Sequence, residues 1–127
     1  MKQMIILLTL LVSLPVMAHD SLWSLCRTKT VIYGDEETLI LNEYEHRNSS
    51  GDGRDTDLKL IFGGNLLSGV FNSTDVSSGP ITLKSKSSRF KGIVKLRDGS
   101  VELNGVLNLY GSKTILKAKF DCEVLRD

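Results

Sequence analysis

Apolar and polar positions alternate along residues 90–120, and this alternation predicts two consecutive β-hairpins. In residues 90–97 the even positions are apolar or small and the odd positions are mostly charged, which is typical of a strand with one buried face. Asp98-Gly99 then predicts a two-residue hairpin turn. This turn sets Leu96 opposite Val101 and Gly92 opposite Gly105, so inward residues face inward residues.

Gly111-Ser112 predicts the second turn, with glycine at its first central position. This turn would set Gly105 opposite Ala118 and Leu103 opposite Phe120, and it preserves the inner face. Gly92, Gly105 and Ala118 would then form one row across three strands. Glycine weakens a strand, so the row suggests sharp coiling of the wall or space for something large inside.

The earlier part of the chain shows the same kind of pattern. Residues 22–33 and 37–46 predict a long hairpin around Gly34-Asp35, which places Trp23 opposite His46. Residues 58–62 and 66–71 predict a hairpin across Gly63-Gly64. Residues 81–84 alternate and pair with the strand from residue 90 through a tight turn in residues 85–88.

These strands define the expected fold class. Eight strands follow one another through short connections, with no helical pattern after residue 18, so we expect an all-β, eight-stranded antiparallel meander barrel. A two-sheet β-sandwich is the alternative. The residues expected to point inward are Leu58, Leu60, Leu67, Phe71, Ile81, Leu83, Phe90, Val94, Leu96, Val101, Leu103, Leu107, Leu116 and Phe120.

Three strands share the pattern apolar, polar, glycine, branched aliphatic, apolar, as in Leu67-Ser68-Gly69-Val70-Phe71. The strand pattern resembles that of calycin-type barrels, and residues 67–71 are similar to the Leu-x-Gly-x-aromatic strands of avidins. The resemblance implies a calycin-like barrel architecture. The inward tryptophans and polar anchors of the avidin site have no counterpart in this chain, so the resemblance implies no site residue.

Residues 1–18 have the pattern of a secretory signal peptide, with Lys2 before an apolar run and Val16-Met17-Ala18 as the cleavage site. Residues 19–127 then form a single domain, which we expect to be a monomer in the periplasm or secreted medium. The apolar run is too short to span a membrane, and no cysteine follows the cleavage site, so we expect no membrane anchor.

Cys26 and Cys122 are the two cysteines of the chain. In an exported protein such a pair predicts a disulfide, here closing a loop of 96 residues. A bond between them requires the first strand to lie beside the last, as barrel closure does. Two separate buried thiols are the alternative.

Charge and motifs exclude several functions. Sixteen Lys and Arg, of which only Lys2 lies in the leader, balance fifteen Asp and Glu, so nothing attracts the chain to nucleic acid. The sequence contains no nucleophile elbow, phosphate-binding glycine loop or histidine metal motif. We therefore expect a protein that is not an enzyme, with no catalytic residue and no cofactor.

Three candidate sites remain. Residues 47–57 and 72–80 predict exposed loops, and the first carries a possible partner site of Asp52, Arg54, Asp55 and Asp57. A possible ligand cavity inside the barrel would involve Trp23, Gly92, Gly105, Ala118 and Phe120; alternatively, Trp23 or a phenylalanine fills that space. The least favoured site binds copper through His19, as a mature amino terminus, and His46.

Two functions follow. In the first, the chain is a binding or inhibitory module that presents its loops to a protein, with the barrel as a rigid frame. In the second, it carries a small apolar ligand in the barrel. The sequence favours the first, because the expected lining of Leu and Phe offers no converging polar groups to orient a ligand.

Overall fold

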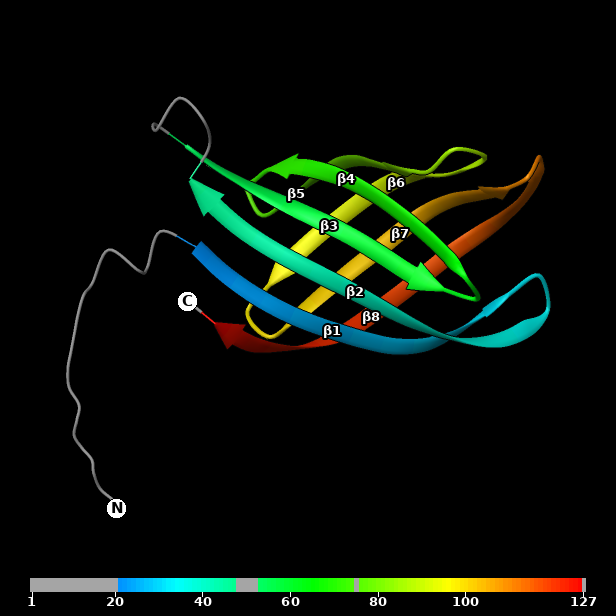
Figure 1. Cartoon of the computed structure of the whole chain (residues 1–127), viewed down its shortest axis with the longest axis horizontal. Coiled ribbons are helices and arrows are strands. Elements are labelled where there is room, and N and C mark those ends of the chain that lie inside the picture. The colour runs from blue at the N-terminus through cyan, green and yellow to red at the C-terminus, as the bar shows by residue number, and fades with distance from the viewer. Residues whose placement is uncertain (1–20, 48–52, 75, 127) are drawn as a thin grey trace, which may run out of the picture.

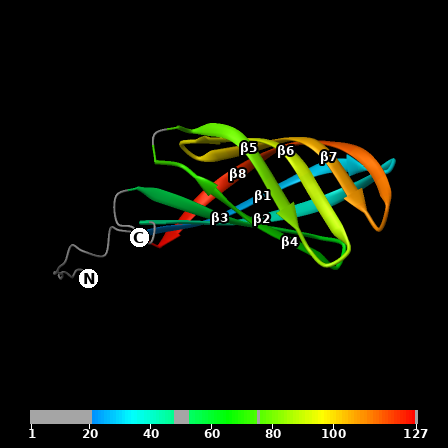
Figure 2. The ribbon, with the colours of Figure 1, turned by 90° about the horizontal axis from the view of Figure 1, so that it is seen from above.

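The computed structural model describes residues 21–47, 53–74 and 76–126, and they form a closed antiparallel barrel in which each strand pairs with its neighbour in sequence. The first strand also pairs with the last, so the predicted meander barrel is confirmed (Figures 1 and 2). The strands are β1 (Ser21–Ile32), β2 (Asp35–Arg47), β3 (Arg54–Phe62), β4 (Asn65–Asn72), β5 (Ser78–Lys84), β6 (Ser88–Arg97), β7 (Ser100–Leu109) and β8 (Ser112–Arg126).

The barrel has two different ends. At one end, β1 begins, β8 ends, and residues 48–53 and 73–77 connect their strands; we call this the loop end, and it lies on the left in Figure 1. At the opposite turn end, tight turns join β1 to β2, β3 to β4, β5 to β6 and β7 to β8. Within the described residues, no helix is long and apolar enough to cross a membrane.

The inner face is a packed apolar core, as the alternation predicts. Of the residues expected to point inward, all are buried except Leu96, which packs against the core while half-buried. Leu39, Leu41 and Ile32 of the first hairpin join this core. The strand pairings of residues 58–62 with 66–71, 81–84 with 89–92, and 90–97 with 100–107 are also confirmed.

Two predicted turns are wrong by one position. The turns are Tyr33-Gly34 and Tyr110-Gly111, with tyrosine at the first central position and φ of 53° and 54° at the two tyrosines. Each register therefore shifts by two residues, which keeps the inner face but changes the partners. Trp23 lies opposite Tyr44, and Ala118 lies opposite Leu103.

Contacts between neighbouring turns explain why tyrosine adopts this backbone conformation. A left-handed conformation costs roughly 1–2 kcal/mol for a residue other than glycine. The Tyr33 hydroxyl donates to the carbonyl of Ser112, and the Tyr110 hydroxyl lies 3.2 Å from Oδ1 of Asn65, to which it donates. These bonds join segments that are far apart in sequence. They offset the free-energy cost of the left-handed backbone at the two tyrosines, and local sequence does not reveal them.

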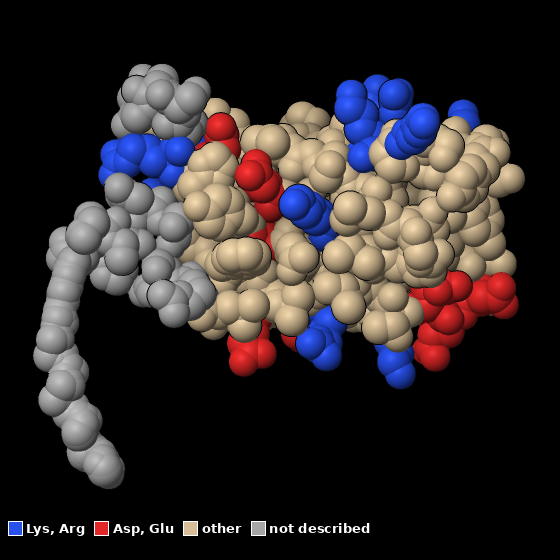
Figure 3. All heavy atoms as spheres, in the orientation of Figure 1, with Lys and Arg blue, Asp and Glu red and all other residues tan. Residues whose placement is uncertain are grey.

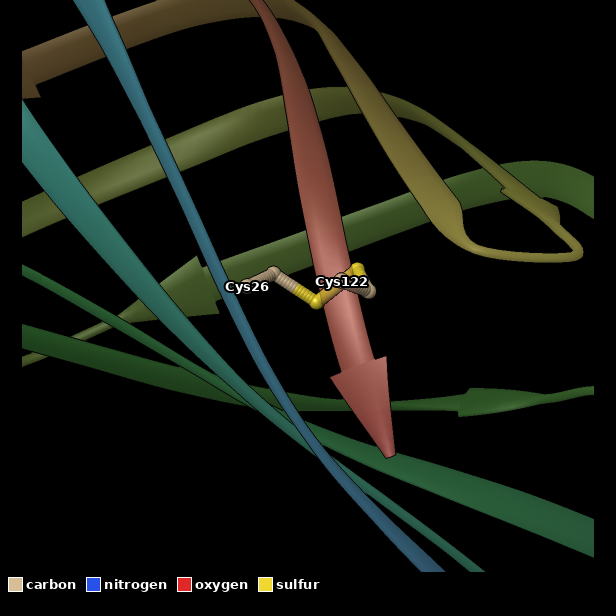
Figure 4. Close-up of a disulfide and its surroundings, with 2 residues drawn as sticks. All are labelled: Cys26 and Cys122. Atoms are coloured by element: carbon tan, nitrogen blue, oxygen red, sulfur yellow. A yellow bond between two sulfur atoms is a disulfide. The ribbon is translucent and has the colours of Figure 1, made fainter. Parts of the chain in front are cut away.

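The disulfide closes the barrel. Cys26 of β1 lies directly opposite Cys122 of β8, and their sulfurs are bonded, as predicted (Figure 4). Direct pairing of β1 with β8 runs only from Trp23 to Arg27. The bond therefore fixes the short seam at which the sheet closes. Because stable disulfides form in oxidising compartments, the bond indicates a location outside the reducing cytoplasm.

Gly92 and Gly105 allow two strands to approach closely. A Cβ on Gly105 would collide with the carbonyl oxygen of Lys91 and lie 2.6 Å from the Cα of Gly92. The predicted row of Gly92, Gly105 and Ala118 is wrong in its third member, because Leu116 lies opposite Gly105. The glycines therefore meet neighbouring backbone, which supports coiling of the wall as their role.

Replacing Gly105 with valine should destabilise the barrel by roughly 1–3 kcal/mol, because the new side chain must displace backbone of β6. Urea unfolding followed by circular dichroism measures the change. Asn104→Val, on the outer face of the same strand, is the matched control and should have a much smaller effect. Equal stabilities of Gly105→Val and the wild type would contradict close strand approach.

Candidate functional site: an acidic pocket at the loop end

The inner face of β2 changes from leucine to glutamate as the strand approaches the loop end. Leu39 and Leu41 are fully buried in the core, and the next two positions of the same face are Glu43 and Glu45. Since side chains of a strand alternate between faces, all four point to the barrel interior. The sheet therefore carries two carboxylates inward where the core ends.

These carboxylates line a pocket of about 240 Å³. Its apolar wall comes from β1, β6 and β8, through Leu22, Leu96 and Val124, and its floor includes the disulfide at Cys122. The complete lining is Leu22, Ser24, Glu43, Glu45, Leu96, Arg97, Asp98, Gly99, Cys122 and Val124. A small hollow with apolar walls and a few polar groups is the usual form of a binding site.

Glu43 is the group with the most unusual environment in this pocket. Burial, with a smaller contribution from the negative charge of Glu45, raises the pKa of Glu43 from its usual 4.5 to about 7. Glu45 forms an ion pair with Arg54, with 3.3 Å between Oε2 and Nε. Among the described residues, Glu43 has no ion-pair or hydrogen-bond partner. Its carboxylate is therefore free to accept a group from outside.

The same carboxylate lies beside the disulfide. One oxygen of Glu43 and the sulfurs of Cys26 and Cys122 all lie within 4.8 Å of one another. Metal ligation by cysteine requires thiolates, and here the two sulfurs are bonded to each other. In the oxidised protein, Glu43 alone of the three can bind a positively charged group.

The structure does not bring the five residues of the predicted cavity together. Phe120 and Ala118 are buried in the core, while Gly92 and Gly105 face neighbouring backbone. Trp23 was expected inside the barrel, and this expectation is wrong, because its side chain lies on the outer face and is 47% exposed. The odd positions of β1 point outward. Among them, Trp23 lies opposite Tyr44, which is on the outer face of β2.

The predicted partner loop is shorter than expected. Arg54, Asp55 and Asp57 belong to β3, where they pair with the last residues of β2, and Asp52 lies outside the described residues. β3 also contacts the other connection, since the backbone N–H of Arg54 donates to Oγ1 of Thr74 at 2.7 Å. The start of β3 therefore lies beside the connection that follows β4.

Of the proposed copper ligands, only His46 can be placed. It lies on the outer face of β2, opposite Ser21, and His19 lies outside the described residues, as do residues 1–18 of the predicted signal. Nδ1 of His46 donates to the carbonyl oxygen of Arg47 at 3.0 Å, and Nε2 lies 3.4 Å from Oδ2 of Asp57. The hydrogen bond to Arg47, followed by the nearby carboxylates, raises the pKa of His46.

The sequence interpretation missed Glu43 and Glu45, although a signal for them exists. Both continue the inward phase of Leu39 and Leu41 at intervals of two residues. Extending that phase through residue 45 would have placed two acidic side chains at the end of the core.

The chain matches no protein-family model, and searches of curated proteins and of solved structures find no match. Fold and pocket together define a small disulfide-closed β-barrel with a carboxylate pocket at one end.

Proposed function

We propose that the protein is an exported binding module whose loop end captures a basic group of a protein partner, with Glu43 as the receiving anion. The observation that carries the proposal is a largely buried carboxylate without a partner among the described residues, in a pocket with apolar walls. Carboxylates with such raised pKa values cluster at functional sites. The signal pattern of residues 1–18 and the disulfide support export.

The pocket suits the side chain of a lysine or arginine. Its volume of about 240 Å³ lies below the roughly 300–1,000 Å³ typical of sites for drug-sized ligands. The aliphatic stem of a basic side chain can pack against Leu22, Leu96 and Val124 while its charged end reaches Glu43. The partner would supply a positive charge next to the carboxylate of Glu43, which burial separates in part from water.

The structure favours this function over carriage of an apolar ligand inside the barrel. Leu58, Leu60 and Leu83, which would line such a cavity, are fully buried in the core together with Phe90 and Phe120. The polar groups able to orient a bound molecule lie instead at the loop end. The proposal involves no catalytic step, so the protein would act by occupying or holding its partner.

Binding can be tested with n-butylamine and n-butylguanidine, which mimic the basic group. NMR chemical-shift changes of the pocket residues measure the binding of each probe. Because Glu43 must lose its proton to pair with a cation, binding should strengthen as the pH rises from about 5 to 8 and then level off. Glu43→Gln should reduce the affinity at pH 8 by about tenfold or more.

Two controls make this test decisive. Glu36→Gln, which changes an exposed glutamate near the turn end of β2, should leave probe binding intact. n-Butanol, which has the same stem without the charge, should bind poorly. Binding of n-butanol as tight as that of n-butylamine, or binding insensitive to Glu43→Gln, would contradict the proposal. Native mass spectrometry that finds an apolar molecule retained by the purified protein would favour the carrier instead.

A further inference from the structure

The outer face of β1 and β2 carries three aromatic rings near the loop end. Trp23 of β1 and Tyr44 of β2 lie opposite each other, with ring centroids 5.8 Å apart and planes at 69°. Tyr44 stacks on His46, with centroids 5.1 Å apart and planes at 24°. The contact with His46 and the contact with Trp23 fix the orientation of the Tyr44 ring.

These rings are exposed although they are large. Trp23 is 47% exposed and Tyr44 is 38% exposed. Aromatic side chains contribute large areas to binding, and their polar atoms tolerate the boundary with water. Rings ordered by mutual contact and left open to solvent therefore form a preorganised platform, defined here as Trp23, Tyr44 and His46.

A pocket of about 270 Å³ lies beside two of these rings. Trp23 and Tyr44 supply the aromatic walls, and Asn42 of β2 with Asp57 and Lys59 of β3 supplies the polar ones. Asn42 and Lys59 are direct cross-strand partners, as are Tyr44 and Asp57. The pocket therefore combines ring surfaces with an amide, a carboxylate and an ammonium group within two rows of the sheet.

The charges of these groups favour neither an anion nor a cation. Asp57 would repel an anion, while Lys59 would repel a cation, so the two together leave the pocket with no net charge. The face in Figure 3 is mostly uncharged, with basic side chains gathered at the upper right and acidic side chains at the lower right. Carboxylate, amide and ammonium together offer both hydrogen-bond acceptors and donors to a neutral polar ligand.

We propose that this pocket binds a sugar ring of a neutral glycan. A pyranose has C–H groups on its faces, which pack against aromatic rings, and hydroxyl groups around its edge, which both donate and accept hydrogen bonds. Tyr44 and Trp23 can pack against the C–H groups. The hydroxyl groups can form hydrogen bonds with Asn42, Asp57 and Lys59. The site is separate from the acidic pocket, because Tyr44 points outward between the inward Glu43 and Glu45.

Trp23 allows a direct test, since it is the only tryptophan of the chain. Its fluorescence is followed while cellotriose, maltotriose and chitotriose are added to the oxidised protein. At least one of the three should cause a saturable change, and saturation-transfer NMR should detect the same sugar. Tyr44→Ala should weaken binding about tenfold, and Asp57→Asn should weaken it measurably.

Control variants separate this site from the rest of the molecule. Tyr110→Ala removes an exposed ring at the turn end, and Glu43→Gln alters the acidic pocket; both should leave sugar binding unchanged. Circular dichroism checks that each variant is folded. The proposal is overturned if none of the three sugars gives a saturable change, or if binding survives both Tyr44→Ala and Asp57→Asn. A protein that occupies the platform while no sugar binds also overturns it.

Discussion

Replacing both cysteines with alanine, Cys26→Ala together with Cys122→Ala, should lower the free energy of unfolding by about 4–5 kcal/mol. The bond closes a loop of 96 residues, and the entropy lost by the unfolded chain on closing such a loop has about this value. The bond also joins the two strands whose pairing, from Trp23 to Arg27, is short. A domain of this size has a limited core, so the loss is a large part of its stability.

Urea unfolding of the wild type and the double variant measures the difference, with dithiothreitol as an independent way to remove the bond. Reductant should bring the wild type close to the variant and leave the variant unchanged. Free thiols in the purified wild type, counted by mass spectrometry without reductant, would contradict the bond. Equal unfolding midpoints would show that strand pairing alone closes the barrel.

Much of the fold is readable from sequence because two hairpins carry turn signals that agree with the faces of their strands. Gly63-Gly64 and Asp98-Gly99 contain residues that accept positive φ, and the flanking strands alternate cleanly. A slip of one residue there would turn the whole inner face of a strand to water. The disulfide is predictable for a related reason, since closure of eight strands requires the termini to meet.

The tyrosine turns show where such reasoning stops. Placing glycine first in each turn is the sound choice on local grounds, because tyrosine with positive φ is unfavourable. The structure selects Tyr33-Gly34 and Tyr110-Gly111 through hydrogen bonds to Ser112 and Asn65, which are the first residues of β8 and β4. A shift of two residues preserves the faces, so the alternation pattern cannot detect the error.

The site is less predictable than the fold, because it depends on depth along the barrel. Alternation can place Glu43 on the inner face, yet it cannot show how deeply the carboxylate is buried or which groups neutralise its neighbour. Those facts depend on Arg54 of β3 pairing with Glu45 and on the wall formed by Leu96 and Val124. Both faces of β1 carry apolar residues, so alternation alone does not show that Trp23 points outward while Cys26 points into the core.

Glu43 should make the protein less stable as the pH rises from about 4.5 to 7. Its folded pKa of about 7 exceeds its usual 4.5, so within this range the folded state binds the proton more tightly than the unfolded state. The stabilising contribution is complete below 4.5, is lost as the pH passes through 7, and stays lost above it. The free energy of unfolding falls by about 3 kcal/mol across this range, as the difference between the two pKa values requires.

Glu43→Gln should remove this dependence, because glutamine has similar shape and no charge. The variant should be more stable than the wild type by about 3 kcal/mol at pH 8 and nearly equal to it at pH 4. Urea unfolding at a series of pH values gives the difference between the two proteins. The other charged groups around the pocket, Glu45, Arg97, Asp98 and Arg54, are present in both proteins, so the comparison isolates the change at position 43.

Glu36→Gln is the matched control, because Glu36 lies exposed on the same strand, and its profile should follow the wild type. A constant difference between Glu43→Gln and the wild type at every pH would contradict a buried carboxylate that titrates near neutrality. If the variant gains stability while losing n-butylamine binding, the two results have one cause. The carboxylate is destabilising in the free barrel because it lacks the cation that the proposed partner brings.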